Sequence, residues 1–351
     1  MECIRVLYQS LVTFIQLLYL SLRREPPETT PTRCAILELP NELLDAIVTH
    51  LPQHSQMLIS QTCRRFQAVA HRNLPAQKYR PDTSEERLLY LSQRARSLPD
   101  RWVCTECTKL HRINVSDTPA HSSYTLRDSK CRNGPEYHGQ YGFRLSNIHV
   151  QLTLKYTRLK NMEPRYENYL KSLTAPYHTY LRPNDLDINK IKRKYSVYPK
   201  IVNGRYLLHT VLRYYQAKSP ISMESMGYIK ICPHREGPSL TGIPAEFYAG
   251  CRSLDTQAET NGTFTNDPKD GLDVCIERAF RLLHTEVCSS CIYCTTDFSV
   301  RASQKDVVVS VWQDFGGEDT AFGTEWSALV LKLRCVYYHF GSIRKLYGQR
   351  D

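Results

Sequence analysis

Apolar side chains recur at helical spacing between residues 36 and 76. Pro40 suits the first position of a helix, where an N–H is not needed, and Glu42 suits the first turn, where the helix dipole favours an acid. Pro52 ends this helix, and a second helix is predicted to begin near Ser55. The apolar side of the first helix consists of Leu39, Leu43, Leu44, Ile47, Val48 and Leu51. That of the second consists of Leu58, Ile59, Thr62, Cys63, Phe66 and Val69. The pattern predicts a small helical domain.

So short a segment cannot bury this much apolar surface within itself, because domains below about 40 residues have too little interior. The excess predicts contact with a second surface, which lies either elsewhere in this chain or on another protein.

An amphipathic helix is also predicted over residues 1–24. Its polar side would be costly to place in lipid, so a packed helix is favoured over membrane contact by residues 4–22, as an interfacial helix or a signal anchor. The proline-rich residues 25–35 follow as a linker. The apolar side of the helix consists of Ile4, Leu7, Tyr8, Leu11, Ile15, Leu18 and Leu22.

The chain after the helical domain divides into further regions. Residues 77–97 predict a connecting helix, with Ser84 as its cap. Residues 98–160 form a first region with Cys and His, irregular in pattern, and residues 161–351 form a mixed region with a second Cys/His cluster. Val307–Trp312 predicts a strand in that region. The fold class expected is therefore α+β: a helical domain (36–76) at the N-terminal side, followed by a mixed, loop-rich region.

Composition and charge are those of a globular protein with a basic surplus. Of 351 residues, 41% are hydrophobic and 23% charged, which argues against wholesale disorder. The formal net charge of +11 permits acidic partners, nucleic acid or anionic membrane. The basic run Lys190–Lys194, followed by Tyr195 and Tyr198, is compatible with nucleic-acid binding or nuclear import, but a solvated strand or loop edge is the preferred interpretation.

Thirteen cysteines suggest metal ligation in a reducing compartment, because several stand in CxxC spacing beside histidines. A cytoplasmic or nuclear protein is therefore expected. The first candidate zinc site is made of Cys104, Cys107, His111 and Cys131. His121 and His138 compete as ligands, and ordinary reduced thiols are the alternative.

The second candidate zinc site is made of Cys232, His234, Cys291 and Cys294. Cys288 is then spare, or it replaces one ligand in a pair with Cys291. Four protein ligands leave no open position on zinc, so either ion would be structural. Phosphate-binding glycine loops, GxSxG elbows and HExxH motifs do not occur in the sequence. No catalytic residues are therefore predicted, and the sequence favours a binding protein over an enzyme.

The helical segment resembles an F-box. The resemblance is carried by Leu39-Pro40-x-Glu42-Leu43-Leu44-x-x-Ile47-x-x-x-Leu51 and by Ser60-x-Thr62-Cys63-Arg64-Arg65-Phe66. It implies docking on a Skp-type adaptor, which leads to a cullin and a ubiquitin ligase of the SCF type, while another part of the chain binds an unknown protein substrate. It also implies that the adaptor contacts Leu39, Pro40, Leu43, Leu44, Ile47 and Leu51. Some of these residues are expected to serve as the core of the domain instead.

The resemblance extends to a group of filamentous-fungal F-box proteins. It is carried by Trp102-Val103-Cys104-x-x-Cys107, Ile231-Cys232-Pro233-His234 and Cys291-x-x-Cys294. The alternative is a zinc-stabilised nucleic-acid-binding or regulatory module without a ligase role.

Overall fold

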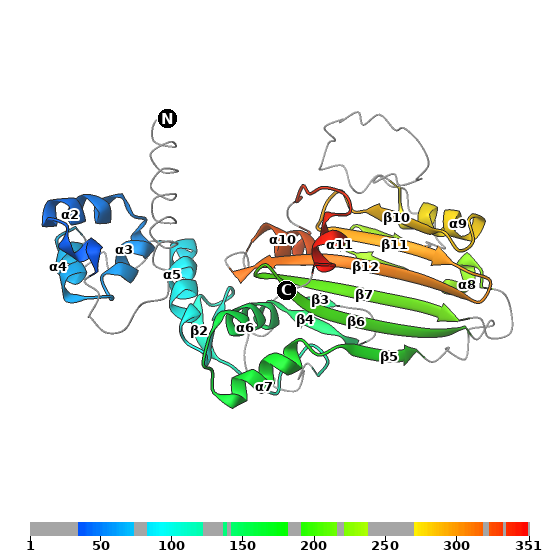
Figure 1. The fold of residues 1–351 in the computed structure, drawn as a ribbon, viewed down its shortest axis with the longest axis horizontal. Helices are drawn as coiled ribbons and strands as arrows, with labels where there is room; N and C mark the ends of the chain where they lie inside the picture. Colours follow the sequence, from blue (N-terminus) through cyan, green and yellow to red (C-terminus); the bar gives the residue numbers. More distant parts are fainter. Residues whose placement is uncertain are drawn as a thin grey trace, which may run out of the picture.

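The computed structural model describes residues 34–73, 83–121, 136–138, 142–181, 191–215, 221–237, 270–318, 323–332 and 335–349. The helix expected over residues 1–24, nearly all of the linker over 25–35, and Cys131 lie outside the described residues. The fold is α+β, as predicted, with a helical part on the N-terminal side and a sheet in the remainder (Figure 1).

The helical part begins with a single turn, η1 (Ala35–Glu38), and continues with α2 (Asn41–His50), α3 (Gln53–Ile59) and α4 (Arg64–Asn73). Where one helix was predicted from Ser55 to Val69, the chain forms α3 and α4 with a turn between them. The hydroxyls of Ser60 and Thr62 donate to the carbonyls of Met57 and Ile59, at 2.8 and 2.7 Å. Such side-chain bonds compete with the helical ladder, which explains why the helix stops there.

The next helix, α5 (Ser84–Arg96), is capped by Thr83 and not by Ser84 as predicted. The Thr83 hydroxyl accepts the Glu86 N–H at 3.1 Å. Glu86 reaches back to α3, where its carboxylate accepts from the backbone N–H of His54 at 3.1 Å and lies 2.7 Å from Nδ1 of the same residue. The helix α5 is therefore held against the preceding helical part.

Residues 98–160 are more regular than their composition suggested. The strands β1 (Arg101–Cys104) and β2 (Lys109–Arg112) form a hairpin, and α6 (Asn147–Arg158) follows the short pair β3 (Glu136–His138) and β4 (Arg144–Ser146). Ser146 caps α6, because its hydroxyl accepts the His149 N–H at 3.4 Å while His149 Nδ1 accepts the Ser146 N–H at 3.1 Å. α7 (Pro164–Leu173) packs beside α6 through buried tyrosines.

Within the described residues, six strands form one antiparallel sheet in the order β10-β11-β12-β7-β6-β5. They are β5 (Tyr177–Leu181), β6 (Lys192–Val202), β7 (Arg205–Tyr215), β10 (Glu286–Ser290), β11 (Thr296–Ala302) and β12 (Asp306–Gly317). The strand predicted at Val307–Trp312 is part of β12. Lys192, Arg193 and Lys194 of the basic run begin β6, so their side chains alternate between the two faces of the sheet.

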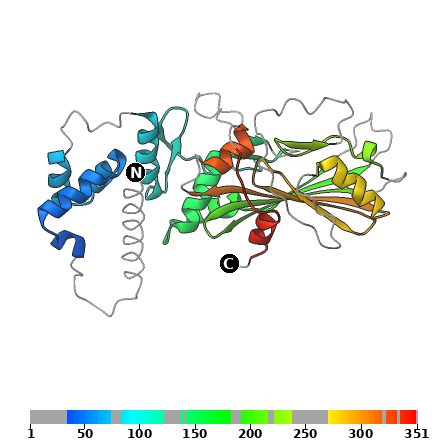
Figure 2. The same ribbon diagram turned by 90° about the horizontal axis from the view of Figure 1, so that it is seen from above.

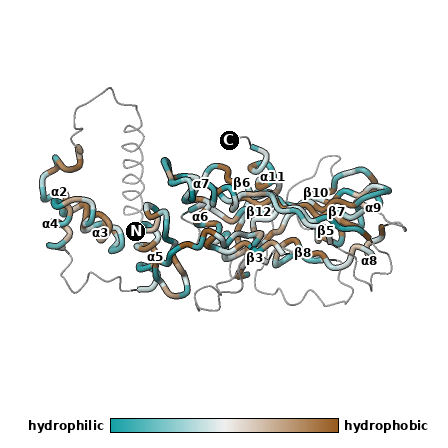
Figure 3. The backbone as a smooth tube through the Cα atoms, turned by 90° about the horizontal axis from the view of Figure 1, so that it is seen from below, coloured by the Kyte–Doolittle hydropathy of each residue, from teal (hydrophilic) through white to brown (hydrophobic). Residues whose placement is uncertain are grey.

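The two faces of this sheet differ in what covers them. The face that we call the core face is covered by α6, α8 (Met223–Met226), the hairpin of β8 (Ile229–Cys232) and β9 (Arg235–Gly237), α9 (Leu272–Arg281), and the segment from α10 (Thr324–Trp326) to Leu331 (Figure 2). The opposite face, which we call the open face, carries α11 (Ser342–Tyr347) across it (Figures 1 and 2). Hydrophobic and hydrophilic residues interchange along the strands (Figure 3), as a sheet with one buried face requires.

A buried carboxylate holds α11 on the open face. Asp297 of β11 is 2% exposed and accepts the backbone N–H groups of Gly341, Ile343 and Arg344 at 3.1, 2.9 and 3.0 Å. These are among the donors that a helix leaves unsatisfied at its N-terminus. Burial raises the pKa of Asp297, against the opposing effect of these donors.

We expect Asp297→Ala to destabilise the docking of α11 by about 1–3 kcal/mol, because the helix N–H groups lose their acceptor in a buried place. Hydrogen exchange of the amides of residues 341–347 in the full chain measures this. The control is Glu277→Ala on α9, an exposed carboxylate whose ion pair with Arg281 should contribute little. Unchanged protection of α11 in the Asp297 variant would contradict the role given to this carboxylate.

Candidate metal centre and adaptor-docking surface

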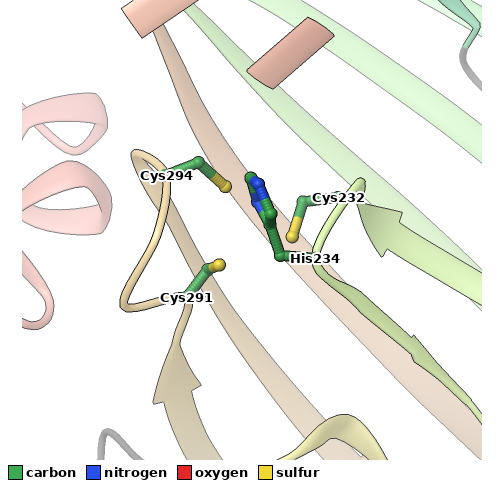
Figure 4. Close-up of side chains that lie close together, drawn as sticks. All are labelled: Cys232, His234, Cys291 and Cys294. Carbon is green, nitrogen blue, oxygen red and sulfur yellow. The ribbon is translucent and has the colours of Figure 1, made fainter. Parts of the chain in front are cut away.

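Four candidate ligands meet at the end of the β10–β11 turn. Cys232 ends β8 and His234 follows in the turn to β9, while Cys291 and Cys294 lie in the loop after β10 (Figure 4). One ligand atom from each of the four lies within 4.8 Å of every other. Tetrahedral zinc places its ligands at about 2.0–2.3 Å from the ion, so a set this close is of the size that one ion needs. The structure thus brings together the residues predicted for the second site.

The backbone holds these residues in place. The Cys291 N–H donates to the Thr296 carbonyl at 2.8 Å, and the Thr296 N–H donates to the Cys294 carbonyl at 2.7 Å, which closes the loop that carries the two thiols. Gln313 of β12 donates from Nε2 to the Ile231 carbonyl at 3.1 Å, which ties β8 to the sheet. The two pieces that supply the ligands are therefore both fixed to the same sheet.

The three thiols of the cluster hold their protons unequally. Burial raises the pKa of Cys232 and of Cys294, whereas hydrogen bonds from Cys232, Cys294 and His234 lower the pKa of Cys291. Nδ1 of His234 is buried and makes no hydrogen bond in the described part of the chain. A buried imidazole nitrogen without a partner is costly, and a metal ion would relieve that cost either directly or by fixing the ring.

Cys288 lies apart from the cluster, although the sequence alternative paired it with Cys291. Its neighbours in β10 alternate between faces, and its sulfur accepts from Arg344 Nη1 at 3.3 Å on the open face. The cluster lies on the core face, where Cys232, Cys291 and Cys294 belong to the apolar core. The geometry therefore favours the set that leaves Cys288 spare.

Three of the four ligands predicted for the first site also meet. Cys104, Cys107 and His111 have ligand atoms within 4.8 Å of one another, and the Cys107 sulfur lies 2.9 Å from His111 Nε2. The imidazole of His111 stacks on Trp102 with ring centroids 5.1 Å apart. The predicted fourth ligand, Cys131, and the side chain of the competing His138 lie outside the described residues. His121 is described and is not part of this group.

The residues predicted for adaptor binding differ in how far they are exposed. Leu43 is 51% exposed and Pro40 is also exposed, whereas Leu39, Ile47 and Leu51 are half-buried. Leu44 is 0% exposed and packs with Val48, Phe66, Val69 and Ala70. Any part that Leu44 has in docking is therefore indirect, through the packing that places its neighbours.

An exposed apolar residue outside the predicted set adds to this surface. Ile36 is 38% exposed and lies in η1, just before Leu39 and Pro40. Arg65 of α4 fixes this end of the surface, because its guanidinium donates to the Leu39 carbonyl at 2.6 Å and to the carbonyl of Leu37. The apolar character of Ile36 was visible in the sequence, but its position before the predicted helix gave no reason to include it.

Comparison with known proteins identifies one part of the chain. The family model of the F-box domain matches residues 36–75, which are the residues of η1, α2, α3 and α4 with their flanks. No curated protein and no solved structure matches the chain. Residues 36–75 are thus an F-box domain. F-box domains bind Skp-type adaptors and through them a cullin. Proteins that carry this domain are typically binding subunits and not enzymes.

Among the described residues, the helices are all too short or too polar to cross a bilayer.

The division of the apolar residues predicts opposite outcomes at two adjacent positions. Leu44→Ala should destabilise the F-box domain by about 2–5 kcal/mol, because it removes buried methyl groups and leaves a cavity. Leu43→Ala should change its stability by about 0.5 kcal/mol or less, because the side chain is half in solvent. Hydrogen exchange in α2 and α4 of the full chain measures both, and equal losses of protection would show that the assignment of core and surface is wrong.

Proposed function

We propose that this chain is the substrate-receptor subunit of a ubiquitin ligase of the SCF type. Its F-box domain docks on a Skp-type adaptor, which links it to a cullin, and the sheet region binds a protein target. The observation that carries the proposal is the F-box match over residues 36–75. The exposed apolar side chains of Leu43 and Ile36 on this same small domain support it.

In this proposal the docking surface comprises Leu39, Pro40, Leu43, Ile47 and Leu51, with Ile36 at its border. Leu44 supports it from within. A partner that covers these side chains removes apolar area from water, which favours association by roughly 25 cal/mol for each Å². The exposed groups are contiguous in the chain from η1 into α2, which suits a single docking partner.

The connection between the F-box domain and the sheet region also suits a receptor. Besides the contact of Glu86 with His54, the far end of α5 is tied to α6 and β12. Arg158 of α6 donates to both carboxylate oxygens of Glu318, at 2.7 and 2.9 Å, and to the Arg96 carbonyl at 2.7 Å. Bidentate pairs of this kind fix direction as well as distance. A receptor needs such a connection, because the target has to be presented at a defined position.

Adaptor capture tests the proposal. Leu43→Glu should abolish capture of a Skp-type adaptor by the full chain, because it places a charge at the centre of an apolar contact while leaving the core of the F-box domain intact. The matched control is Leu89→Glu on α5, where an exposed leucine receives the same substitution. Leu43→Ala combined with Ile47→Ala should weaken capture as well.

Absence of capture by the unaltered chain, or equal capture by the Leu43→Glu variant, would sink the receptor role. The chain would then be better explained as a nucleic-acid-binding or regulatory module stabilised by zinc.

We also propose that structural zinc occupies the set Cys232, His234, Cys291 and Cys294, and that a second zinc is held by Cys104, Cys107 and His111 with Cys131. Four protein ligands leave no position for water, so the ions would stabilise the fold without chemistry of their own. In the set around Cys232 the ion would join the β8–β9 hairpin to the β10–β11 turn. Thiols that serve as ligands have to stay reduced, which is consistent with a location in the cytoplasm or nucleus.

Metal analysis of the purified protein tests both sites. Emission spectroscopy should give about two zinc ions per chain, and Cys291→Ser with Cys294→Ser should remove about one of them and lower the melting temperature. Cys288→Ser is the matched control, since this thiol stands in the same cysteine run but faces the other side of the sheet. Zinc content below about half an ion per chain would exclude both sites.

A further inference from the structure

The open face of the sheet carries its large side chains in rows. Strands in register place partner residues side by side on the same face. One such row runs across all of the described strands of the sheet. Its members are Tyr180, Lys194, Arg213, Val308, Arg301 and Glu286, each paired with the next. We call it the basic row.

Two cations lie directly opposite each other in this row. Lys194 of β6 pairs with Arg213 of β7, and like charges in such positions are destabilising. Compensation within the described chain is weak: Arg213 has Asp306 at 3.9 Å, and the Lys194 ammonium lies 5.7 Å from the ring centre of Tyr180. A sheet that keeps this arrangement has a surface suited to a negatively charged ligand.

The side chains around the basic row also carry a surplus of positive charge. Lys192 precedes it on β6, and Arg344 of α11 borders it from the other side, where it pairs with Glu286 at 3.0 Å. Among the described residues, the acids on this part of the face are Asp306, Glu286 and, beneath α11, Asp297, and the bases outnumber them. The bases are Lys192, Lys194, Arg213, Arg301 and Arg344.

Between the basic row and α11 lies a strip of smaller side chains. It consists of His178, Ser196, Val211, Ser310, Ser299 and Cys288, again paired from strand to strand. Ser299 is 2% exposed and donates to the Glu286 carboxylate at 2.7 Å, and Ser196 is 4% exposed, so larger neighbours cover these two positions. At the β10 end the Arg344 guanidinium donates both to Cys288 of the strip and to Glu286 of the basic row, at 3.3 and 3.0 Å. An extended chain on this face would therefore lie over the basic row and not within the strip.

The aromatic rings beside α11 are engaged with one another, whereas Tyr180 at the edge of the basic row is 70% exposed. His209 stacks on Trp312 with ring centroids 4.8 Å apart and on Tyr198 at 5.8 Å, and Tyr347 of α11 packs against His209. Burial, with Arg344 nearby, lowers the pKa of His209 to about 4, so this ring stays neutral. Single-stranded nucleic acid is bound by stacking successive bases on several aromatic faces, and the single exposed ring of Tyr180 on an edge strand does not provide such a series. The face therefore favours a peptide.

We propose that the open face binds an acidic, extended segment of the target protein, laid across the strands with its carboxylates against the basic row. The proposal rests on the receptor role and specifies where and what the receptor binds. Strands lie about 4.8 Å apart and an extended chain covers about 3.4 Å per residue, so roughly seven residues would cross the sheet.

Fluorescence anisotropy with the full chain tests this. The probe is a labelled peptide of about ten residues that alternates Glu and Ser, long enough to cross the sheet. It should bind, and binding should weaken as salt is raised. A peptide of alternating Lys and Ser should not bind.

The decisive variant is Lys194→Glu. It should leave the melting temperature unchanged or raise it, because a carboxylate would then stand opposite Arg213, and yet weaken binding of the acidic peptide by about tenfold or more. Lys171→Glu on α7 is the matched control at another lysine and should bind as before. Lys194→Gln removes the charge without reversing it, and its peptide binding provides a second test if Lys194→Glu disturbs the fold.

Absence of peptide binding, or equal binding by both lysine variants, overturns the inference. Tighter binding of an oligothymidine strand that also depends on Lys194 overturns it too and assigns the face to nucleic acid. Adaptor capture should be the same in the Lys194→Glu variant and the unaltered chain. Loss of the peptide with intact capture therefore contradicts only this inference, while loss of capture with intact peptide binding contradicts the receptor role.

Discussion

The pairing of β7 with β12 is the interaction on which the sheet region depends. It joins residues 205–215 to residues 306–317 and forms the middle of the sheet. Side chains alternate along these strands, so one face had to become the core and the other had to stay accessible. The buried tyrosines and valines of the core face then fix where α6, α9 and the β8–β9 hairpin pack. The cysteine cluster lies on this face because Cys232 and Cys294 are part of the apolar core that packs there.

The same alternation of side chains explains why the two faces of the sheet carry different kinds of residue. The candidate metal ligands lie on the covered side, and the cations of the basic row lie on the other side. The connecting helix α5 joins this sheet to the F-box domain through polar contacts at both of its ends, with Glu86 at one and Glu318 beside the other. These contacts are specific in direction, so the proposed adaptor-docking surface and the proposed target-binding face are presented in a set relation to each other.

Much of the F-box domain could be read from the sequence, because its helices carry their own signals: the proline stops, the acidic first turn and the apolar spacing. That Cys232, His234, Cys291 and Cys294 lie together was also predictable, since their short spacings are typical of zinc ligands. The competition between neighbouring hydroxyl groups for backbone hydrogen-bond partners was harder to predict. The turn at Ser60 and the cap at Thr83 depend on which of several hydroxyls finds a carbonyl or an N–H. α6 was missed because its sequence mixes β-branched and polar residues, and its stability comes from burial against β1 and β7.

The separation of faces could not be predicted either, because it requires the strand register. Lys194 and Arg213 are distant in the sequence from Arg301, and only the pairing through β12 brings them into one row. A single basic run was visible at Lys190–Lys194, but Arg193 within it lies over the ring of Tyr214, on the core face. Charge along a chain is thus a poor guide to charge on a sheet until the neighbours of each strand are known.

The sequence distance across the central strand pair has a consequence for biosynthesis. The F-box helices have short-range contacts and can form as soon as they leave the ribosome, whereas β7 must wait for much of the remaining chain before β12 arrives. Until then the β6–β7 hairpin presents an unpaired edge rich in valine, leucine and tyrosine, which is a template for association with other chains. A nascent or truncated product that ends before residue 306 would therefore carry a folded F-box domain joined to an incomplete sheet that is prone to aggregate.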